Sequence, residues 1–215
     1  MSPLRNLLVV SAFTASTFAG AAHANTVTGS LFHVSEATSQ NAIPANVPGG
    51  TPDVTFSVNS PFNFSGTNVT VGTWLASSGA FGIVQNTPGT LTSLMDNGSV
   101  GTLLNFTGNV SVTNGQMFTV THDDGLTLII GGVNLGFNPG PTAPVVTTAT
   151  YTGPTGNFPF QLVYGECCQG PAVLQVDLPF QSAVPLPAAL PLFATGLGLM
   201  GLLGWRRKRK AQAAV

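Results

Sequence analysis

The chain has 215 residues, with only six Lys or Arg and seven Asp or Glu. All six cations lie near the two ends, and all seven acids lie between Asn25 and Ala183, so this central body has a formal charge of −7. A surface without cations cannot neutralise phosphates, which excludes nucleic acids as partners of the body. Anionic polysaccharides are poor direct partners for the same reason, unless a metal ion bridges the two.

Residues 1–24 have the organisation of a secretory signal peptide. A single cation, Arg5, precedes an apolar stretch that runs from Leu7 to Ala22. Ala22-His23-Ala24 then provides the small-x-small pattern of a cleavage site. The sequence therefore predicts export, with cleavage after Ala24.

The C-terminal end predicts a transmembrane helix. Residues 188–205 are 18 residues without a charge. As a helix they would span about 27 Å at ~1.5 Å per residue, close to a hydrocarbon core of roughly 30 Å. Trp205 is placed for the membrane interface, and a basic cluster follows that should remain cytoplasmic. The cluster consists of Arg206, Arg207, Lys208, Arg209 and Lys210.

Residues 184–215 resemble a PEP-CTERM sorting signal, in which a short Pro-containing motif precedes one apolar helix and a terminal basic cluster. Val184, Pro185 and Pro187 match the family's V-P-x-P positions, and Leu186 stands where the family's Glu would be. The resemblance implies processing by an exosortase-type protease in a Gram-negative bacterium. After export through the inner membrane, the body would be released to the cell surface or extracellular matrix. The alternative is a permanent single-pass anchor.

The body, residues 25–183, has the pattern of one all-β domain. Short runs rich in Val, Thr and Phe alternate with Gly, Pro, Asn and Ser, and no segment shows sustained helical periodicity. Many short strands at this spacing predict an antiparallel β-sandwich or jelly roll. Asp123-Asp124-Gly125 separates two apolar runs and predicts a hairpin turn. Residues 39–52 and 138–144 are predicted to be loops.

Two segments of the body, Phe118–Gly132 and Phe160–Leu178, resemble the second half of a PA14-type β-sandwich. In that family a strand leads into Asp-Asp-Gly and a strand of the form L-x-I-x-G, and a later segment has the form Y-x-E-x-x-G-x-A-x-L. The matching residues here are Asp123, Asp124, Gly125, Leu128, Ile130, Gly132, Tyr164, Glu166, Gly170, Ala172 and Leu174.

The PA14 resemblance implies a non-catalytic module, and some members bind carbohydrate through calcium. It makes Asp123 and Asp124 the candidate calcium ligands, with Glu166 as a ligand from a second loop if the two matching segments lie side by side. Carboxylate oxygens suit Ca²⁺, which can also coordinate sugar hydroxyls. The alternative is that the two Asp residues only form a polar turn. His122, beside them, is interpreted as a polar residue at a strand end, because imidazole favours softer metals.

Cys167 and Cys168 are adjacent in sequence, which leaves their state open. An exported protein favours disulfides, but adjacent Cα atoms lie only about 3.8 Å apart, below the usual disulfide range. A vicinal disulfide, two free thiols and intermolecular pairing all remain alternatives. A catalytic role is unsupported, because the spacing is not C-x-x-C and the body has no cation to lower a thiol pKa.

The function expected from the sequence is that of a non-catalytic structural or interaction module of a biofilm or exopolysaccharide layer. One alternative is a calcium-dependent carbohydrate-binding module. Another is a glycan hydrolase, for which Glu36 and Glu166 would have to form a carboxylate pair with nearby Asp residues. No motif of a serine hydrolase, zinc protease or nucleotide-binding enzyme occurs in the chain, so we expect that the protein is not an enzyme.

Overall fold

The computed structural model describes residues 26–176 and 178. The predicted signal peptide, the V-P-L-P motif, the apolar segment 188–205 and the basic cluster lie outside the described residues. Within the described ranges, no helix is sufficiently long and apolar to cross a membrane.

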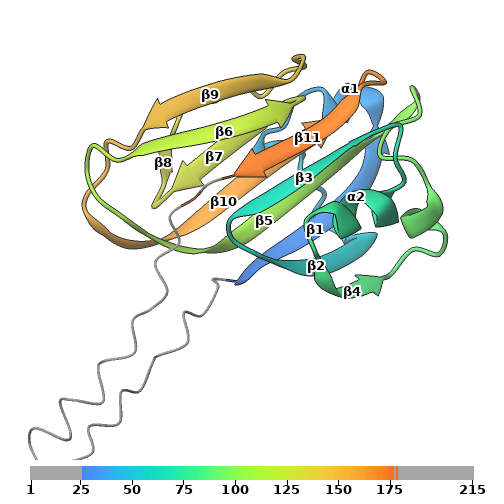
Figure 1. Ribbon diagram of the computed structural model, residues 1–215, viewed down its shortest axis with the longest axis horizontal. Helices are drawn as coiled ribbons and strands as arrows, with labels where there is room; N and C mark the ends of the chain where they lie inside the picture. The colour runs from blue at the N-terminus through green and yellow to red at the C-terminus, as the bar shows by residue number, and fades with distance from the viewer. Residues whose placement is uncertain (1–25, 177, 179–215) are drawn as a thin grey trace, which may run out of the picture.

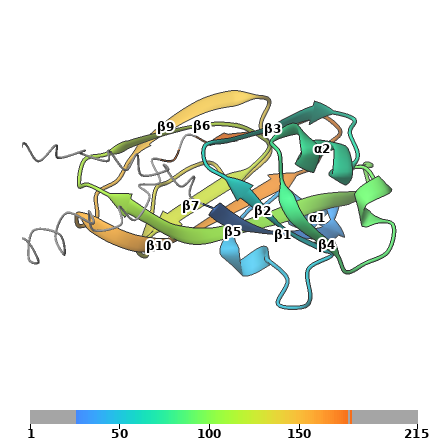
Figure 2. The same ribbon diagram turned by 60° about the horizontal axis from the view of Figure 1, so that its bottom comes forward.

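Two antiparallel sheets form the described body, with one sheet packed over the other (Figures 1 and 2). The larger sheet has seven strands in the order β4 (Phe81–Gln85), β2 (Val54–Asn59), β1 (Thr26–Ser35), β5 (Val100–Val112), β10 (Gly156–Glu166), β7 (Leu126–Ile130) and β8 (Val133–Asn134). The smaller sheet has four, in the order β3 (Phe62–Thr67), β11 (Pro171–Val176), β6 (Met117–Asp123) and β9 (Val145–Thr150). The predicted all-β antiparallel sandwich is confirmed.

An alternating burial pattern along the strands explains why the two sheets pack face to face. In β2, Val54, Phe56 and Val58 are buried, and the residues between them are not. In a strand, alternate side chains point to opposite faces, so one face becomes apolar. The core between the sheets is rich in aromatic rings, which include Phe56, Phe62, Phe64, Trp74, Phe106 and Tyr164.

Two short α-helices, α1 (Glu36–Ser39) and α2 (Val71–Ser77), were not expected from the sequence. Helix α2 buries Val71, Trp74 and Leu75, and the side chain of Thr70 caps its N-terminus by accepting the N–H of Thr73. Seven residues are too few to show helical periodicity. The helix therefore depends on tertiary packing rather than on intrinsic propensity. Two 3₁₀ turns, η1 (Pro44–Asn46) and η2 (Thr90–Thr92), lie in the loops.

The hairpin predicted at Asp123-Asp124-Gly125 is wrong. β6 pairs with β11 and β9 in the smaller sheet, whereas β7 pairs with β10 and β8 in the larger one. The three residues therefore cross from one sheet to the other, and the Asp123-Asp124 peptide bond is cis. Each flanking strand has neighbours on both edges within its own sheet, so β6 and β7 do not pair with each other.

Trp74 is the side chain whose loss should affect the fold most. It is fully buried, stacks on Phe64 with ring centroids 4.3 Å apart, and donates its Nε1–H to the carbonyl of Ala172 at 3.1 Å. We predict that Trp74→Ala lowers the free energy of unfolding by about 3–5 kcal/mol, measured by urea denaturation. Met117→Ala is the control, because Met117 is 69 % exposed and its loss should change stability by less than about 0.5 kcal/mol. Equal losses in both variants would contradict this account of the core.

Candidate cation site between the two sheets

Asp123 and Asp124 lie at the crossing between the sheets, and each is only 4 % exposed. His122, also buried, fixes the backbone there: its Nδ1 lies 2.6 Å from the Asp124 carbonyl oxygen and its Nε2 lies 3.1 Å from Thr147 Oγ1. Gly125 follows directly, and a Cβ at this position would lie 2.0 Å from the carbonyl oxygen of Pro139. Only glycine permits this close approach, which brings the loop after β8 against the two acids.

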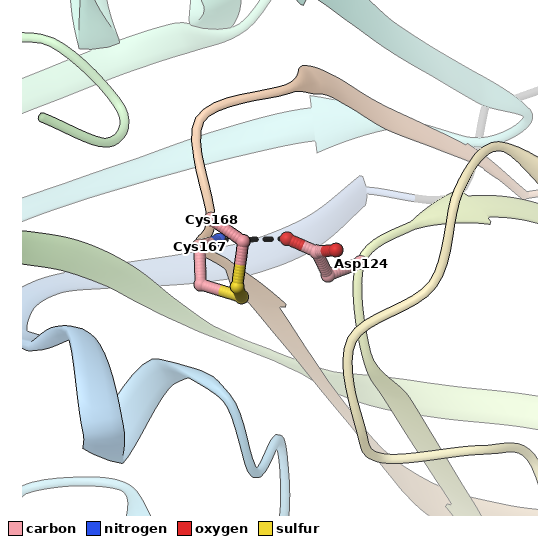
Figure 3. Close-up of side chains that lie close together, drawn as sticks. All are labelled: Asp124, Cys167 and Cys168. Atoms are coloured by element: carbon pink, nitrogen blue, oxygen red, sulfur yellow. Dashed lines mark hydrogen bonds between the residues drawn. A yellow bond between two sulfur atoms is a disulfide. The ribbon is translucent and has the colours of Figure 1, made fainter. Parts of the chain in front are cut away.

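Backbone amides hold the carboxylate of Asp124 from two sides. Its Oδ2 accepts the N–H of Cys167 at 2.8 Å, and its Oδ1 accepts the N–H of Thr142 at 3.2 Å. Figure 3 shows the first of these contacts, with the carboxylate pointing toward the loop after β10. Two amide donors stabilise the charged form of this carboxylate and fix its orientation.

The carboxylate of Asp123 differs from that of Asp124, because its Oδ2 atom is buried and receives no N–H or O–H from the residues around it other than a proton shared with the Asp124 carboxyl. The nearest glycine in the loop above is Gly170, where an added Cβ would lie 3.9 Å from this oxygen. A buried carboxylate oxygen without a partner is costly, and most such groups in proteins are satisfied by a donor, a water or an ion. Asp123 Oδ2 is therefore an available oxygen ligand.

Residues 167–170 form the loop that joins β10 to β11 and covers the two acids. Cys168 and Gln169 have φ angles of +68° and +56°, a left-handed conformation that is uncommon outside glycine. A vicinal disulfide joins Cys167 to Cys168, whose Cα atoms are 3.8 Å apart. Cys167 is buried and Cys168 is exposed, so one side of the loop is open to solvent.

Asp96 also contributes to this site, although nothing in the sequence pointed to it. Its Oδ2 accepts the N–H of Gln169 and its Oδ1 accepts the N–H of Gly98 at 2.9 Å. Asp96 lies in the loop between η2 and β5, far from the other acids in sequence. No spacing rule connects it with them, and only the tertiary fold brings it to the loop over Asp124.

Glu166 lies near the two Asp residues, but its carboxyl contacts the hydroxyl of Tyr164. The Tyr164 hydroxyl oxygen is 2.6 Å from Glu166 Oε2 and also within hydrogen-bond distance of the carbonyl oxygen of Asp123. A tyrosine hydroxyl has one proton, so it cannot donate to both oxygens. Burial raises the pKa of Glu166 to about 9, so at neutral pH its carboxyl carries the second proton and donates it to the Tyr164 oxygen. Tyr164 then donates to Asp123.

The two adjacent Asp carboxyls also titrate abnormally. Burial, followed by the charge of Asp124 and a hydrogen bond between the two carboxyls, raises the pKa of Asp123 to about 7. Burial raises the pKa of Asp124 as well, while the N–H groups of Cys167 and Thr142 oppose this shift. Neither acid has a Lys or Arg partner, because none occurs between Asn25 and Trp205. A bound cation would offset the same repulsion that a proton offsets.

The structure brings some of the predicted ligands together and separates others. Asp123 and Asp124 lie side by side, whereas Glu166 connects to them through Tyr164. Among the described residues, the donor atoms of three metal-ligating side chains lie within 4.8 Å of one another only in the group of Asp124, Cys167 and Cys168. Glu166 is thus connected to the two Asp residues through Tyr164, and the loop 167–170 contacts them through the N–H of Cys167 and through Gly170.

A second polar cluster joins His33 to Ser93, at a distance of 3.3 Å between Nε2 and Oγ. Ser93 donates its hydroxyl proton to the carbonyl oxygen of Thr90 at 2.6 Å. Asp53 accepts the backbone N–H of His33 at 2.7 Å. These three residues do not form the relay that activates a serine nucleophile, because the serine proton is directed to Thr90. The cluster joins β1 to the loop after η2.

No family model matches the chain, and no curated protein matches it. Among solved structures, it is similar to a PA14 sugar-binding domain from an RTX adhesin, with 15 % identity, a TM-score of 0.50, and coverage of 72 % of this chain and 91 % of that one. The crystal structure of the PA14 domain of the antifreeze protein MpAFP is also similar, with 16 % identity, a TM-score of 0.47, and coverage of 74 % and 84 %. The first likeness shows that the body has the fold of a PA14 domain, as its two sequence motifs indicated.

The raised pKa values predict that the ligand-free protein loses stability as the pH rises. An acid whose pKa is raised on folding binds more protons in the folded state, so stability falls between the unfolded and folded pKa values. These limits are 3.8 and about 7 for Asp123, and 4.5 and about 9 for Glu166. Glu166→Gln keeps a donor for Tyr164 but removes one titrating group. Its melting temperature should fall less steeply than that of the wild type between pH 5 and pH 9. Parallel curves would contradict the protonated state of Glu166.

Proposed function

We propose that the body is a calcium-dependent carbohydrate-binding module, and that Asp123 and Asp124 hold the ion. The observation that carries this proposal is the buried Oδ2 of Asp123, which has no partner although it lies beside a second carboxylate. Among the described residues, there is no Lys or Arg to satisfy it. A cation is the partner that would complete both carboxylates at once.

The donor set favours a hard ion of the calcium type. Ca²⁺ takes six to eight oxygen ligands at roughly 2.3–2.6 Å and accepts carboxylates, backbone carbonyls and sugar hydroxyls in the same sphere. The two Asp carboxylates supply oxygens from the crossing, and Gly170 lies near the free oxygen of Asp123. When bound, the ion would supply the open positions at which vicinal hydroxyls of a sugar coordinate.

The surrounding residues prepare the carboxylates for this role. The N–H groups of Cys167 and Thr142 orient Asp124, and Tyr164 holds the carbonyl of Asp123 from the core side. The sequence-based prediction made Glu166 a direct ligand from a second loop. In our proposal it is instead the protonated partner of Tyr164. It reaches the ion through Tyr164 and Asp123 rather than by its own oxygens.

The charge of the body limits the class of sugar. The body has seven acids and no Lys or Arg, so it would repel the negative charges of uronic and sulfated glycans. Neutral glycans are therefore the favoured ligands. The similar PA14 domain of the RTX adhesin is described as sugar-binding, which supports the same class of ligand here. Attachment to a neutral exopolysaccharide would suit an exported module of a biofilm matrix.

The two ends of the chain support export and sorting as part of this proposal. Residues 1–24 would direct secretion, and the V-P-L-P motif at 184–187 with the apolar segment and basic cluster would be recognised by an exosortase-type protease. The module would then be displayed at the cell surface or released into the matrix. A retained single-pass anchor is the alternative outcome of the same tail.

Calcium should stabilise the protein. An ion that binds only the folded state at 100 times its Kd contributes about 2.7 kcal/mol, which corresponds to a rise in melting temperature of roughly 5–10 °C for a domain of this size. We predict this rise in millimolar CaCl₂ relative to EDTA, by differential scanning calorimetry. Changing both Asp123→Asn and Asp124→Asn should abolish it.

The matched control is Glu36→Gln, compared with Asp123→Asn. Both remove one negative charge, but Glu36 begins α1 and is partly exposed, whereas Asp123 is buried at the crossing between the sheets. Glu36→Gln should keep the full calcium response, and Asp123→Asn should lose most of it. Identical melting curves of the wild type in calcium and in EDTA would contradict the proposed calcium site.

Processing at both ends should be visible in the mass of the exported protein. We predict that the mature chain begins at Asn25 and ends near Pro187, because export and sorting signals lie outside these limits. Intact-mass spectrometry of the extracellular form in the native host measures both ends. Recovery of the Arg206–Lys210 peptide from extracellular material would contradict removal of the tail and favour the anchor.

A further inference from the structure

The disulfide loop forms a second group of metal ligands, which shares only Asp124 with the proposed calcium site. The Sγ atoms of Cys167 and Cys168 and a carboxylate oxygen of Asp124 all lie within 4.8 Å of one another. Figure 3 shows the disulfide and the Asp124 carboxylate close together at this loop. As a disulfide, the sulfurs are weak ligands, but as thiolates they bind soft metals.

We propose that reduction of the Cys167–Cys168 disulfide creates a site for one soft divalent ion of the zinc and cadmium class, held by both thiolates and Asp124. This ion and calcium exclude each other, because both take the Asp124 carboxylate. The exclusion rests on the proposed calcium site, whereas the soft-metal site stands on the sulfur and carboxylate geometry alone.

The geometry of adjacent cysteines suits chelation. Zinc binds thiolate sulfur at about 2.3 Å and carboxylate oxygen at about 2.0–2.2 Å with tetrahedral angles, which requires the two sulfurs to be about 3.8 Å apart. The disulfide already directs both side chains to one place within 4.8 Å of an Asp124 oxygen, so after reduction both sulfurs can reach one ion. Three protein ligands leave a fourth position for water, and exposed Cys168 provides access from solvent.

The surroundings attract cations. Asp96 accepts the N–H of Gln169 in the same loop, and its charge acts on both Asp124 and Glu166. No Lys or Arg among the described residues competes for the thiolates or for the carboxylate. Gln40 Nε2 lies 3.5 Å from Cys168 Sγ and donates to it.

The chemical steps balance with a phosphine as the reductant. The phosphine transfers two electrons to the S–S bond, the bond breaks, two protons from water complete two thiols, and the phosphine takes up the oxygen of that water. Binding of the divalent ion then displaces the two thiol protons and forms two metal–sulfur bonds. A low-molecular-weight thiol can supply the same two electrons by exchange, and it is itself oxidised to a disulfide.

The test is a cadmium titration of the purified protein before and after reduction with a phosphine, followed by the ultraviolet absorption of cadmium–thiolate bonds. The reduced protein should bind one equivalent, and the oxidised protein should show no such absorption. Cys168→Ser in the same reducing buffer should lose the absorption. Asp124→Asn should weaken binding by at least the roughly 10–100-fold that loss of a supporting ligand contact causes. The variant Cys167→Ser with Cys168→Ser, checked for folding by circular dichroism, gives the background.

Three outcomes separate this inference from the calcium proposal. If the reduced wild type binds cadmium no better than the double Ser variant, the soft-metal site does not exist, whatever calcium does. If cadmium binds as expected and calcium never raises the melting temperature of the oxidised protein, the soft-metal site stands and the calcium proposal fails. If the cadmium-loaded protein keeps the full calcium response, the two ions occupy separate sites and the exclusion is wrong.

Discussion

Buried carboxylates without any basic partner are the constraint on which the site depends. Asp123, Asp124 and Glu166 are each at most 4 % exposed, and no Lys or Arg occurs between Asn25 and Trp205. Burying a charge is tolerated only when it is paired, hydrogen-bonded, neutralised by a proton or bound to a metal. Asp124 uses two backbone amides, and Glu166 uses a proton shared with Tyr164. Asp123 keeps one oxygen without a partner, so this is the oxygen of the cluster that is most available to a ligand.

The sandwich brings these acids together by crossing between its layers. β6 ends in the smaller sheet and β7 begins in the larger one, so residues 123–125 lie where the chain passes from one sheet to the other. The loop after β8 approaches on one side through Gly125, and the loop 167–170 covers the other. Three segments far apart in the sequence therefore define one small site.

The sequence predicted the class of fold but not the connections within it. Alternating apolar residues mark strands such as β2 and β11, because a half-buried strand has a period of two. The pairing of strands has no comparable local signature, so Asp123-Asp124-Gly125 was interpreted as a hairpin although its flanking strands pair elsewhere. Helix α2 escaped prediction because seven residues with one capping Thr depend on the packing of Trp74. The motif identified Asp123 and Asp124, whereas Asp96 joined the site through the tertiary fold alone.

The core and the site are connected by one continuous set of contacts. Trp74 donates to the carbonyl of Ala172 and stacks parallel to Tyr164 at 5.9 Å between ring centroids. Tyr164 in turn holds the carbonyl of Asp123, so the backbone of the site is anchored directly to the most buried aromatic rings. The core therefore sets the position of this carbonyl, and in the proposed calcium site little ordering of this segment would remain for binding. Preorganisation of this kind raises affinity without additional contacts, because the entropy of ordering the ligands has already been lost on folding.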